Sequence, residues 1–274
     1  MPGERQGVGI LAPFRCAWVH RGLLFELVKR ELTAEHRGAV LGPLWLVLTP
    51  LLLLGVYTFA FGVVLQVRWG RSVDAPSEFA LVAFASLSVF WIFSESVGRA
   101  HLTIFQNAGY VKRSVFPLEI LPWASMGAAL FRTAVSLGVF ALFHAMLWGL
   151  LPWTALLTPI VVLPLVVLSL GLSWFLASLG VYLRDIGPLV GIFVTGALFL
   201  SPVFYPATAV PEAYRAFVVL NPIAFAVEQA RGVLIFGEAH DWGRLALHAL
   251  AAWAIAWLGF SWFARTRRGF ADVL

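Results

Sequence analysis

Residues 41–66 read LGPLWLVLTPLLLLGVYTFAFGVVLQ, an apolar stretch that contains no charged side chain. A bilayer core about 30 Å thick needs roughly 20 residues of α-helix at 1.5 Å each, so this stretch is long enough to cross it. Five further stretches meet the same condition, at about 79–98, 120–148, 155–182, 188–205 and 243–264. The pattern predicts an all-α integral membrane protein, with one domain over residues 1–274 and a six-span bundle over 41–264.

Composition and the positions of the charged residues also indicate a membrane protein. Of the residues, 61% are hydrophobic and only 12% are charged, which is too little charge for the surface of a soluble domain. Thirteen of the 19 Lys and Arg residues fall on the side that holds the N-terminus, five fall on the opposite side, and Arg132 falls inside a span. Because basic residues concentrate in the cytoplasm, we expect both termini to be cytoplasmic. The net charge of +5 comes from basic residues that flank the spans, and we expect these residues to contact membrane lipid rather than nucleic acid.

Two of the predicted cytoplasmic segments are expected to form helices or an ordered loop. Residues 18–37 carry a stripe of Leu24, Leu27, Val28 and Leu32 between charged positions, which predicts an amphipathic helix lying along the headgroups. The alternative is a helix packed on the inner face of the bundle. Residues 99–119 form the substantial internal cytoplasmic loop. This loop is either a surface connector or a short helix that presses on a cytoplasmic partner.

The outer segment 207–236 is too apolar for an ordinary loop, although prolines interrupt it. Its two pieces, about 211–220 and 223–236, are only about 10 to 14 residues long, which is too short for a full crossing. We expect re-entrant half-helices that enter the membrane from its outer face. Glu228 and Arg231 lie three residues apart on the second piece, so we expect a structural ion pair there.

The sequence lacks the motifs of the common catalytic sites. A phosphate-binding loop ends in Gly-Lys-Ser/Thr, whereas Lys29 and Lys112, the only lysines, each follow a valine. The histidines lack the His-Glu-x-x-His spacing of zinc enzymes, and Cys16 is the only cysteine. A Gly-x-Ser-x-Gly elbow is also absent. We therefore expect no catalysis by this chain, and neither a metal nor a cofactor bound to it.

Two ionisable residues fall within predicted spans: Glu95 near the inner end of the second, and Arg132 deeper in the third. An unpaired charge in hydrocarbon is costly, so we expect a structural Glu95–Arg132 pair. A secondary transporter would need several such groups and a clear internal repeat, and the sequence shows neither.

Several segments form an ordered pattern along the chain. They are Leu41–Trp45 continuing to Thr49-Pro50, Tyr57–Gly62, Lys112–Pro122, Arg184–Ile186, Ser201–Pro206, Asn221-Pro222 with Glu228 and Arg231, and Phe270–Leu274. Together they resemble the type-2 ABC transporter permeases, in the branch that exports lipid-linked polysaccharides such as O-antigen. The resemblance covers roughly residues 25–274.

The resemblance implies a half-channel in the bacterial inner membrane that pairs with a second copy of itself. Two copies of a separate ABC ATPase would bind ATP and Mg, and the cargo would be a polysaccharide linked to undecaprenyl diphosphate. The candidate residues for coupling to the ATPase are Lys112, Arg113, Phe116, Pro117, Glu119, Arg184 and Asp185. The candidate residues for an outer gate are Ser201, Pro202, Pro206, Asn221, Pro222, Glu228 and Arg231.

A sugar polymer is wide, hydroxyl-rich and mostly uncharged, so its path needs breadth and stacking surfaces. Spans one and five supply such rings as candidates: Tyr57, Phe59, Phe61, Phe193, Phe199, Phe204 and Tyr205. The alternative is that these rings only pack against neighbours or lipid. The helical frame does not select the cargo either, so a teichoic acid, a capsular polymer, a lipid or a drug stays open. An integral membrane enzyme acting on a lipid carrier is the competing class.

Overall fold

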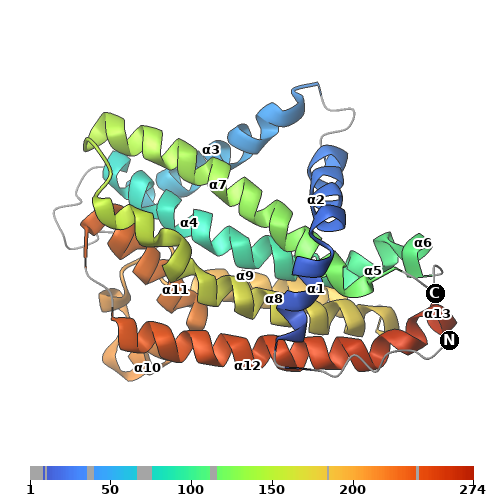
Figure 1. The fold of residues 1–274 in the computed structure, drawn as a ribbon. Coiled ribbons are helices and arrows are strands. Elements are labelled where there is room, and N and C mark those ends of the chain that lie inside the picture. The colour runs from blue at the N-terminus through green and yellow to red at the C-terminus, as the bar shows by residue number, and fades with distance from the viewer. Residues whose placement is uncertain are drawn as a thin grey trace.

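The computed structural model describes residues 9, 11–35, 40–66, 76–111, 116–183, 185–238 and 241–274. Within these ranges every regular element is helical, which confirms the predicted all-α class. Four long helices form the body: α4 (Pro76–Gly98), α7 (Leu121–Leu147), α8 (Thr158–Tyr182) and α12 (Trp242–Thr266). They lie side by side in Figure 1, with α8 packed against both α4 and α12.

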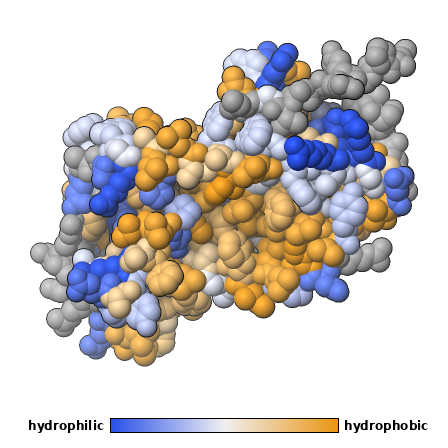
Figure 2. All heavy atoms as spheres, turned by 90° about the horizontal axis from the view of Figure 1, so that it is seen from below, coloured by the Kyte–Doolittle hydropathy of each residue, from blue (hydrophilic) through white to orange (hydrophobic). Residues whose placement is uncertain are grey.

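In the described part of the chain, five helical stretches are long and apolar enough to cross a membrane. They are Gly42–Val64, Glu78–Gln106, Leu118–Leu147, Trp153–Tyr182 and Trp242–Val273. A sixth candidate is the pair Glu212–Leu220 and Pro222–Phe236, whose two parts are bent by 88°. Figure 2 shows a broad hydrophobic middle, with hydrophilic residues gathered toward the two ends. The protein is therefore an integral membrane protein with several apolar helices.

The predicted span 188–205 is not among these candidate spans, because its helix ends early and is too short. Helix α9 covers only Ile186–Leu200, which is about 22 Å at 1.5 Å per residue. Its end is set by Pro202, because the residue before a proline avoids the helical region. Ser201 accordingly has an extended backbone, with φ −99° and ψ 144°.

The first span consists of a 3-10 turn η1 (Gly42–Leu44), α3 (Trp45–Tyr57) and a π-helical segment η2 (Thr58–Val64). It packs on α4 and α7 along one side. Only 6% of its most apolar window is buried within the chain. Most of its surface must therefore face lipid or another polypeptide.

The predicted single helix 18–37 is instead two helices, α1 (Ala12–Val19) and α2 (Arg21–Glu35), which meet at His20. Tertiary contacts explain the break. In α1, Phe14 stacks on Trp253 of α12 at 4.7 Å, and the Pro13 carbonyl accepts a hydrogen bond from Trp123. Helix α2 then turns away and lies across α7 (Figure 1).

The apolar stripe of α2 packs onto α7. Leu27 is buried, and Val28 approaches Gly127 so closely that a Cβ on Gly127 would lie 2.6 Å from the Val28 Cγ2. This contact agrees with a helix packed on the bundle, which was the alternative to a purely interfacial one. Its depth relative to the headgroups stays a prediction.

The short elements gather at the two ends of the bundle. One end holds η3 (Ala100–Leu102), α5 (Thr103–Gln106), α6 (Ala108–Val111), η4 (Leu118–Ile120), η9 (Arg267–Gly269) and α13 (Phe270–Val273). The other end holds η5 (Trp153–Leu157), η6 (Ala207–Ala209), η7 (Glu212–Tyr214), α10 (Arg215–Leu220), α11 (Pro222–Arg231) and the π-helical η8 (Gly232–Phe236). In Figure 1, α5, α6 and α13 lie at the end opposite to α10. In its described parts, 99–111 and 116–119, the loop 99–119 is thus built from short helical turns.

Helices α8 and α12 approach closely because glycines face each other between them. A Cβ built on Gly259 would lie 2.0 Å from the Gly171 carbonyl oxygen, and one on Gly171 would lie 2.6 Å from the Ala256 Cα. Small residues let helix backbones pack closely where lipid supplies no hydrophobic driving force.

We expect Gly259→Ala to destabilise the protein by about 1–3 kcal/mol, because the added methyl group meets backbone that cannot move aside. The midpoint of thermal unfolding in detergent measures this effect. Gly138→Ala on α7 is the matched control, since nothing lies within 4 Å of its added Cβ. Alanine favours a helix over glycine, so the control should match or exceed the wild-type midpoint. Equal midpoints for the two variants would contradict the close packing.

Candidate functional site

Several of the predicted gate residues meet at the end of the bundle that holds α10 and α11, around the break before α11. We call Ser201, Pro202, Asn221, Glu228 and Arg231 the outer cluster, after the side of the membrane on which they are predicted to lie. Asn221 caps α11, since its Oδ1 accepts hydrogen bonds from the backbone of Ile223 at 3.0 Å and Ala224 at 3.4 Å. Its Nδ2 donates to the Ser201 Oγ at 3.0 Å. Pro222 fits the first helical turn, where its missing N–H has no helical partner to lose. Asn221 thus holds the end of α9 against the start of α11.

Arg231 is the most buried cation of this outer cluster, with 5% of its surface exposed. Its guanidinium donates to the Pro202 carbonyl at 3.1 Å and to the Ser86 Oγ of α4 at 3.5 Å. The expected ion pair with Glu228 is present but long, at 3.9 Å. Arg231 therefore joins α11, the turn after α9, and α4. Pro206, the remaining gate candidate, leads into η6.

The predicted aromatic residues divide into two groups. Phe204 is 1% exposed and packs against Tyr57 and stacked Phe61, each with ring centroids 4.6 Å away. Phe199 lies 6.4 Å from the same ring, and its carbonyl accepts a hydrogen bond from the Tyr205 hydroxyl at 2.8 Å. By contrast, Phe59 and Phe193 are 62% and 52% exposed. The first group links η2 to the outer cluster, while the lining of a path for sugars stays a prediction.

One contact holds the loop 99–119, which is predicted to be cytoplasmic and is called the inner loop below. The sequence did not reveal this contact. Arg30 of α2 donates hydrogen bonds to the Asn107 Oδ1 at 2.7 Å and to the Tyr110 hydroxyl at 2.6 Å. Tyr110 in turn stacks on Phe116 with centroids 4.3 Å apart. Pro117 follows at the start of η4. Arg30, Asn107 and Tyr110 carry no local signal, because their pairing spans about 80 residues of sequence.

The other coupling candidates are placed differently. Asp185 is exposed and immediately precedes α9. Lys112, Arg113 and Arg184 lie outside the described residues. Glu119 is buried and forms an ion pair with Arg267, which ties the C-terminal segment to η4. In this structure Glu119 is therefore covered, although the prediction placed it among residues that couple to a partner.

Cys16 of α1 lies near this ion pair. Burial, and secondarily the Glu119 carboxylate, raises the pKa of the Cys16 thiol from 9.0 to about 12. The thiol is consequently neutral near pH 7 and behaves as a packing residue. In the described ranges no three His, Cys, Asp or Glu side chains come together in a way that could hold a metal ion.

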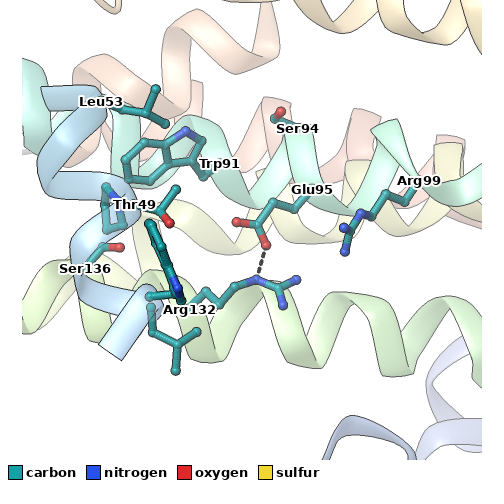
Figure 3. Close-up of a pocket in the computed structure, with 11 residues that line it drawn as sticks. Thr49, Leu53, Trp91, Ser94, Glu95, Arg99, Arg132 and Ser136 are labelled. Carbon is teal, nitrogen blue, oxygen red and sulfur yellow. Dashed lines mark hydrogen bonds and ion pairs between the residues drawn. The ribbon is translucent and has the colours of Figure 1, made fainter. Parts of the chain in front are cut away.

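The expected Glu95–Arg132 pair is present between α4 and α7. The Arg132 Nε donates to the Glu95 carboxylate, as Figure 3 shows. The pair borders a cavity of about 450 Å³ that is also lined by Arg99 and by residues of α3. The ion pair means that neither charge is left uncompensated inside the bundle.

Comparisons with known proteins agree over most of the chain. The sequence matches the ABC-2 type transporter family over residues 22–235. It is 30% identical over 258 residues to the O-antigen export system permease protein RfbA of Myxococcus xanthus, covering 93% of this chain and 96% of that protein. A protein of the same name from Klebsiella pneumoniae is 22% identical over 266 residues, covering 92% and 96%. The polysialic acid transport protein KpsM of Escherichia coli is 24% identical over 229 residues, covering 77% and 80%.

Arg231→Gln should lower the stability of the protein by about 2 kcal/mol, because hydrogen bonds from a buried charged group to Pro202 and Ser86 are lost. The midpoint of thermal unfolding in detergent and the rate of trypsin cleavage report the change. Arg215→Gln is the matched control, since Arg215 is exposed and makes one hydrogen bond to a backbone carbonyl nearby. The control should stay within about 0.5 kcal/mol. If both variants behave alike, Arg231 does not hold the outer cluster together.

Proposed function

The chain belongs to the ABC-2 type transporter family, and from this premise we propose that it is the channel-forming membrane subunit of a polysaccharide exporter. The cargo is an O-antigen-like polysaccharide linked to undecaprenyl diphosphate, moved from the cytoplasm across the bacterial inner membrane. The observation that carries this proposal is the similarity to an O-antigen export permease over almost the whole length of both proteins. The family is one of transporter permeases, which agrees with a non-catalytic role.

A separate ABC ATPase supplies the energy. This chain carries no phosphate-binding loop, so ATP and Mg bind to the partner. A movement of the ATPase against the inner loop would be passed to α4, because α4 continues into η3 and α5 without a long break. The bonds from Arg30 to Asn107 and Tyr110 pass any movement of that loop to α2. The coupling surface we propose is therefore the loop around Tyr110 and Phe116, together with Asp185.

A second copy completes the channel. A single bundle is packed with its own side chains along α4 and α8, and it leaves little room for a hydrated polymer. The exposed surface of the first span offers a face for lipid or for the second copy. With both termini in the cytoplasm, the bent pair at the opposite end lies at the outer face. There it serves as a re-entrant gate, and α2 lies at the inner headgroups.

A capsular polymer is the alternative cargo. The similarity to a polysialic acid transport protein supports it, over a smaller share of both chains. The two cargoes differ in the glycan and in its carrier, so the material that accumulates in cells without this protein distinguishes them.

Deletion of the gene tests the proposed function. The surface glycan should disappear, and lipid-linked glycan should accumulate inside the cell, until the wild-type chain is restored. Normal surface glycan in the deletion strain would overturn the proposal. So would transport by the purified chain in vesicles without any ATPase.

Arg30→Ala should reduce export at least tenfold while leaving the amount of protein in the membrane unchanged, because the inner loop loses its tie to α2. Surface glycan and the protein level in the membrane fraction are the two measurements. Arg21→Ala is the matched control on the same helix, where Arg21 lies over the Trp18 ring at 5.5 Å. Replacing Arg184, or the stretch from Lys112 to Phe116, should abolish export in the same way. Normal export by these variants, with the ATPase still co-purifying, would contradict the coupling assignment.

A further inference from the structure

Helices α8 and α12 form an apolar groove that shares no residue with the cavity at the Glu95–Arg132 pair. Its volume is about 390 Å³, within the roughly 300–1,000 Å³ of ligand pockets. The two helices meet at Gly171 and Gly259, which have no side chains to fill the space between them. Figure 2 looks at the bundle from below Figure 1, where α12 is the lowest long helix, and the middle of this face is hydrophobic.

The groove faces the membrane. Leu258, Trp262 and Phe175 line it and are 59%, 44% and 39% exposed, and all three lie within candidate spans. The Phe175 and Trp262 rings contact each other with centroids 5.9 Å apart, about one helical turn from the two glycines. Indole prefers the headgroup zone, so Trp262 marks the depth at which the groove meets the headgroups. A hydrocarbon chain that begins at this depth therefore fits the groove.

A cation lies at the end of the groove that is predicted to be cytoplasmic. Arg265 belongs to the last turn of α12, is exposed and lines the groove. In the described part of the chain no carboxylate pairs with Arg265, whereas Arg267 is paired with Glu119. Guanidinium is always charged and forms two-pronged hydrogen bonds with phosphate oxygens. Basic groups between spans at the cytoplasmic side bind anionic lipid headgroups, so the charge and position of Arg265 match an inner-leaflet lipid.

A buried hydroxyl group lies between this cation and the apolar part of the groove. Ser261 is 5% exposed, and its Oγ has no hydrogen-bond partner among the residues that the structure describes. The buried serines Ser86, Ser88 and Ser96 of α4 instead each donate to the carbonyl four residues earlier. An unpaired buried hydroxyl is costly, so it needs an acceptor. Ser261 lines the groove, and a rotation about its χ1 directs the hydroxyl toward an acceptor there.

The order of these groups along α12 matches the order of groups in a glycerophospholipid. Arg265 follows Ser261 by four residues, which is about 6 Å of helix. In such a lipid the ester groups lie one glycerol unit deeper in the membrane than the phosphate, and the acyl chains lie deeper still. Leu258 and Ile255 come next along the groove, at the depth of an acyl chain. The apolar part alone would also suit a helix of a second copy, but the cation and the unpaired hydroxyl select a lipid.

We propose that the groove between α8 and α12 binds one anionic phospholipid of the inner leaflet. Its phosphate lies on Arg265, an ester oxygen accepts a hydrogen bond from Ser261, and an acyl chain lies along Leu258 and Ile255. This site goes beyond the proposed function, since the ligand is a component of the membrane and neither the cargo nor its carrier. The alternative is that Arg265 contacts passing headgroups without a defined site.

The test titrates phosphatidylglycerol into the purified full-length chain in a nonionic detergent and counts the bound lipid by native mass spectrometry. The wild type should bind one lipid per chain and saturate. Arg265→Gln should raise the dissociation constant about tenfold, since a charged hydrogen-bond donor is lost. Leu258→Trp should also raise it about tenfold, because the indole displaces part of the acyl chain from the groove.

Ser261→Ala separates lipid binding from stability. The dissociation constant should rise about threefold, because a hydrogen bond to the lipid is lost. Without lipid, the midpoint of thermal unfolding should match or exceed that of the wild type, since the variant removes an unpaired buried hydroxyl. A lower midpoint with unchanged lipid binding would overturn the place of Ser261 in the site.

Arg268→Gln is the matched control, because Arg268 is an exposed cation three residues further on and does not line the groove. This variant should bind phosphatidylglycerol as tightly as the wild type. Equal weakening by Arg265→Gln and Arg268→Gln would mean that the lipid responds only to surface charge, and would overturn the site. Unchanged binding by both Arg265→Gln and Leu258→Trp would also overturn it.

Three further measurements identify the occupant. Phosphatidylcholine should bind at least tenfold more weakly than phosphatidylglycerol, since its choline offsets the phosphate charge. Undecaprenyl diphosphate at equal concentration should leave phosphatidylglycerol bound, and its displacement would assign the groove to the carrier. Loss of dimers by Leu258→Trp without a change in lipid binding would assign the groove to a second copy. Either result, or equal binding of phosphatidylcholine, would overturn the proposal. None of these measurements involves export, so its failure leaves the proposed function standing.

Discussion

Hydrocarbon neither hydrogen-bonds backbone groups nor solvates charge, and this constraint decides most of the structure. Every described regular element is a helix, because a helix satisfies its own backbone. The same constraint requires a partner for each charge within the bundle. Arg132 has Glu95, and Arg231 has the Pro202 carbonyl, Ser86 and Glu228. Where the chain breaks, as before α11, the side chain of Asn221 replaces the lost helical hydrogen bonds.

The long helices were predictable, because length and hydrophobicity alone decide whether a segment can span a membrane. The predicted stretches 79–98, 120–148 and 243–264 differ from α4, α7 and α12 by only a few residues at either end. The pairs Glu95–Arg132 and Glu228–Arg231 were predictable too, since a charge in an apolar stretch must be compensated.

The tertiary contacts could not be read from the sequence. Arg30 and Tyr110 are about 80 residues apart in sequence, and Arg267 and Glu119 are 148 residues apart. No local sequence pattern therefore predicts either contact. A similar limit applies to the aromatic residues. Composition identified Phe59 and Phe204 as equivalent candidates, yet packing buries Phe204 and leaves Phe59 exposed. The end of α9 could have been predicted, because Pro202 disfavours a helical conformation at Ser201. The predicted span 188–205 was drawn from hydrophobicity alone and ran past this proline.

Helix α4 connects the two ends at which function is expected. At its inner end it carries Glu95 and leads through Arg99 into the loop that Arg30 holds. Nearer its outer end, Ser86 accepts a hydrogen bond from Arg231 of the outer cluster. Twelve residues separate Ser86 from Gly98, which is about 18 Å of helix. The apolar window of this span is 78% buried, so α4 is packed on nearly every side and we expect any movement of it to be that of a rigid unit. In the mechanism we propose, a displacement of the inner loop therefore reaches Arg231 through one element. A shift of α4 between two positions would then link an ATPase at one face to a gate at the other.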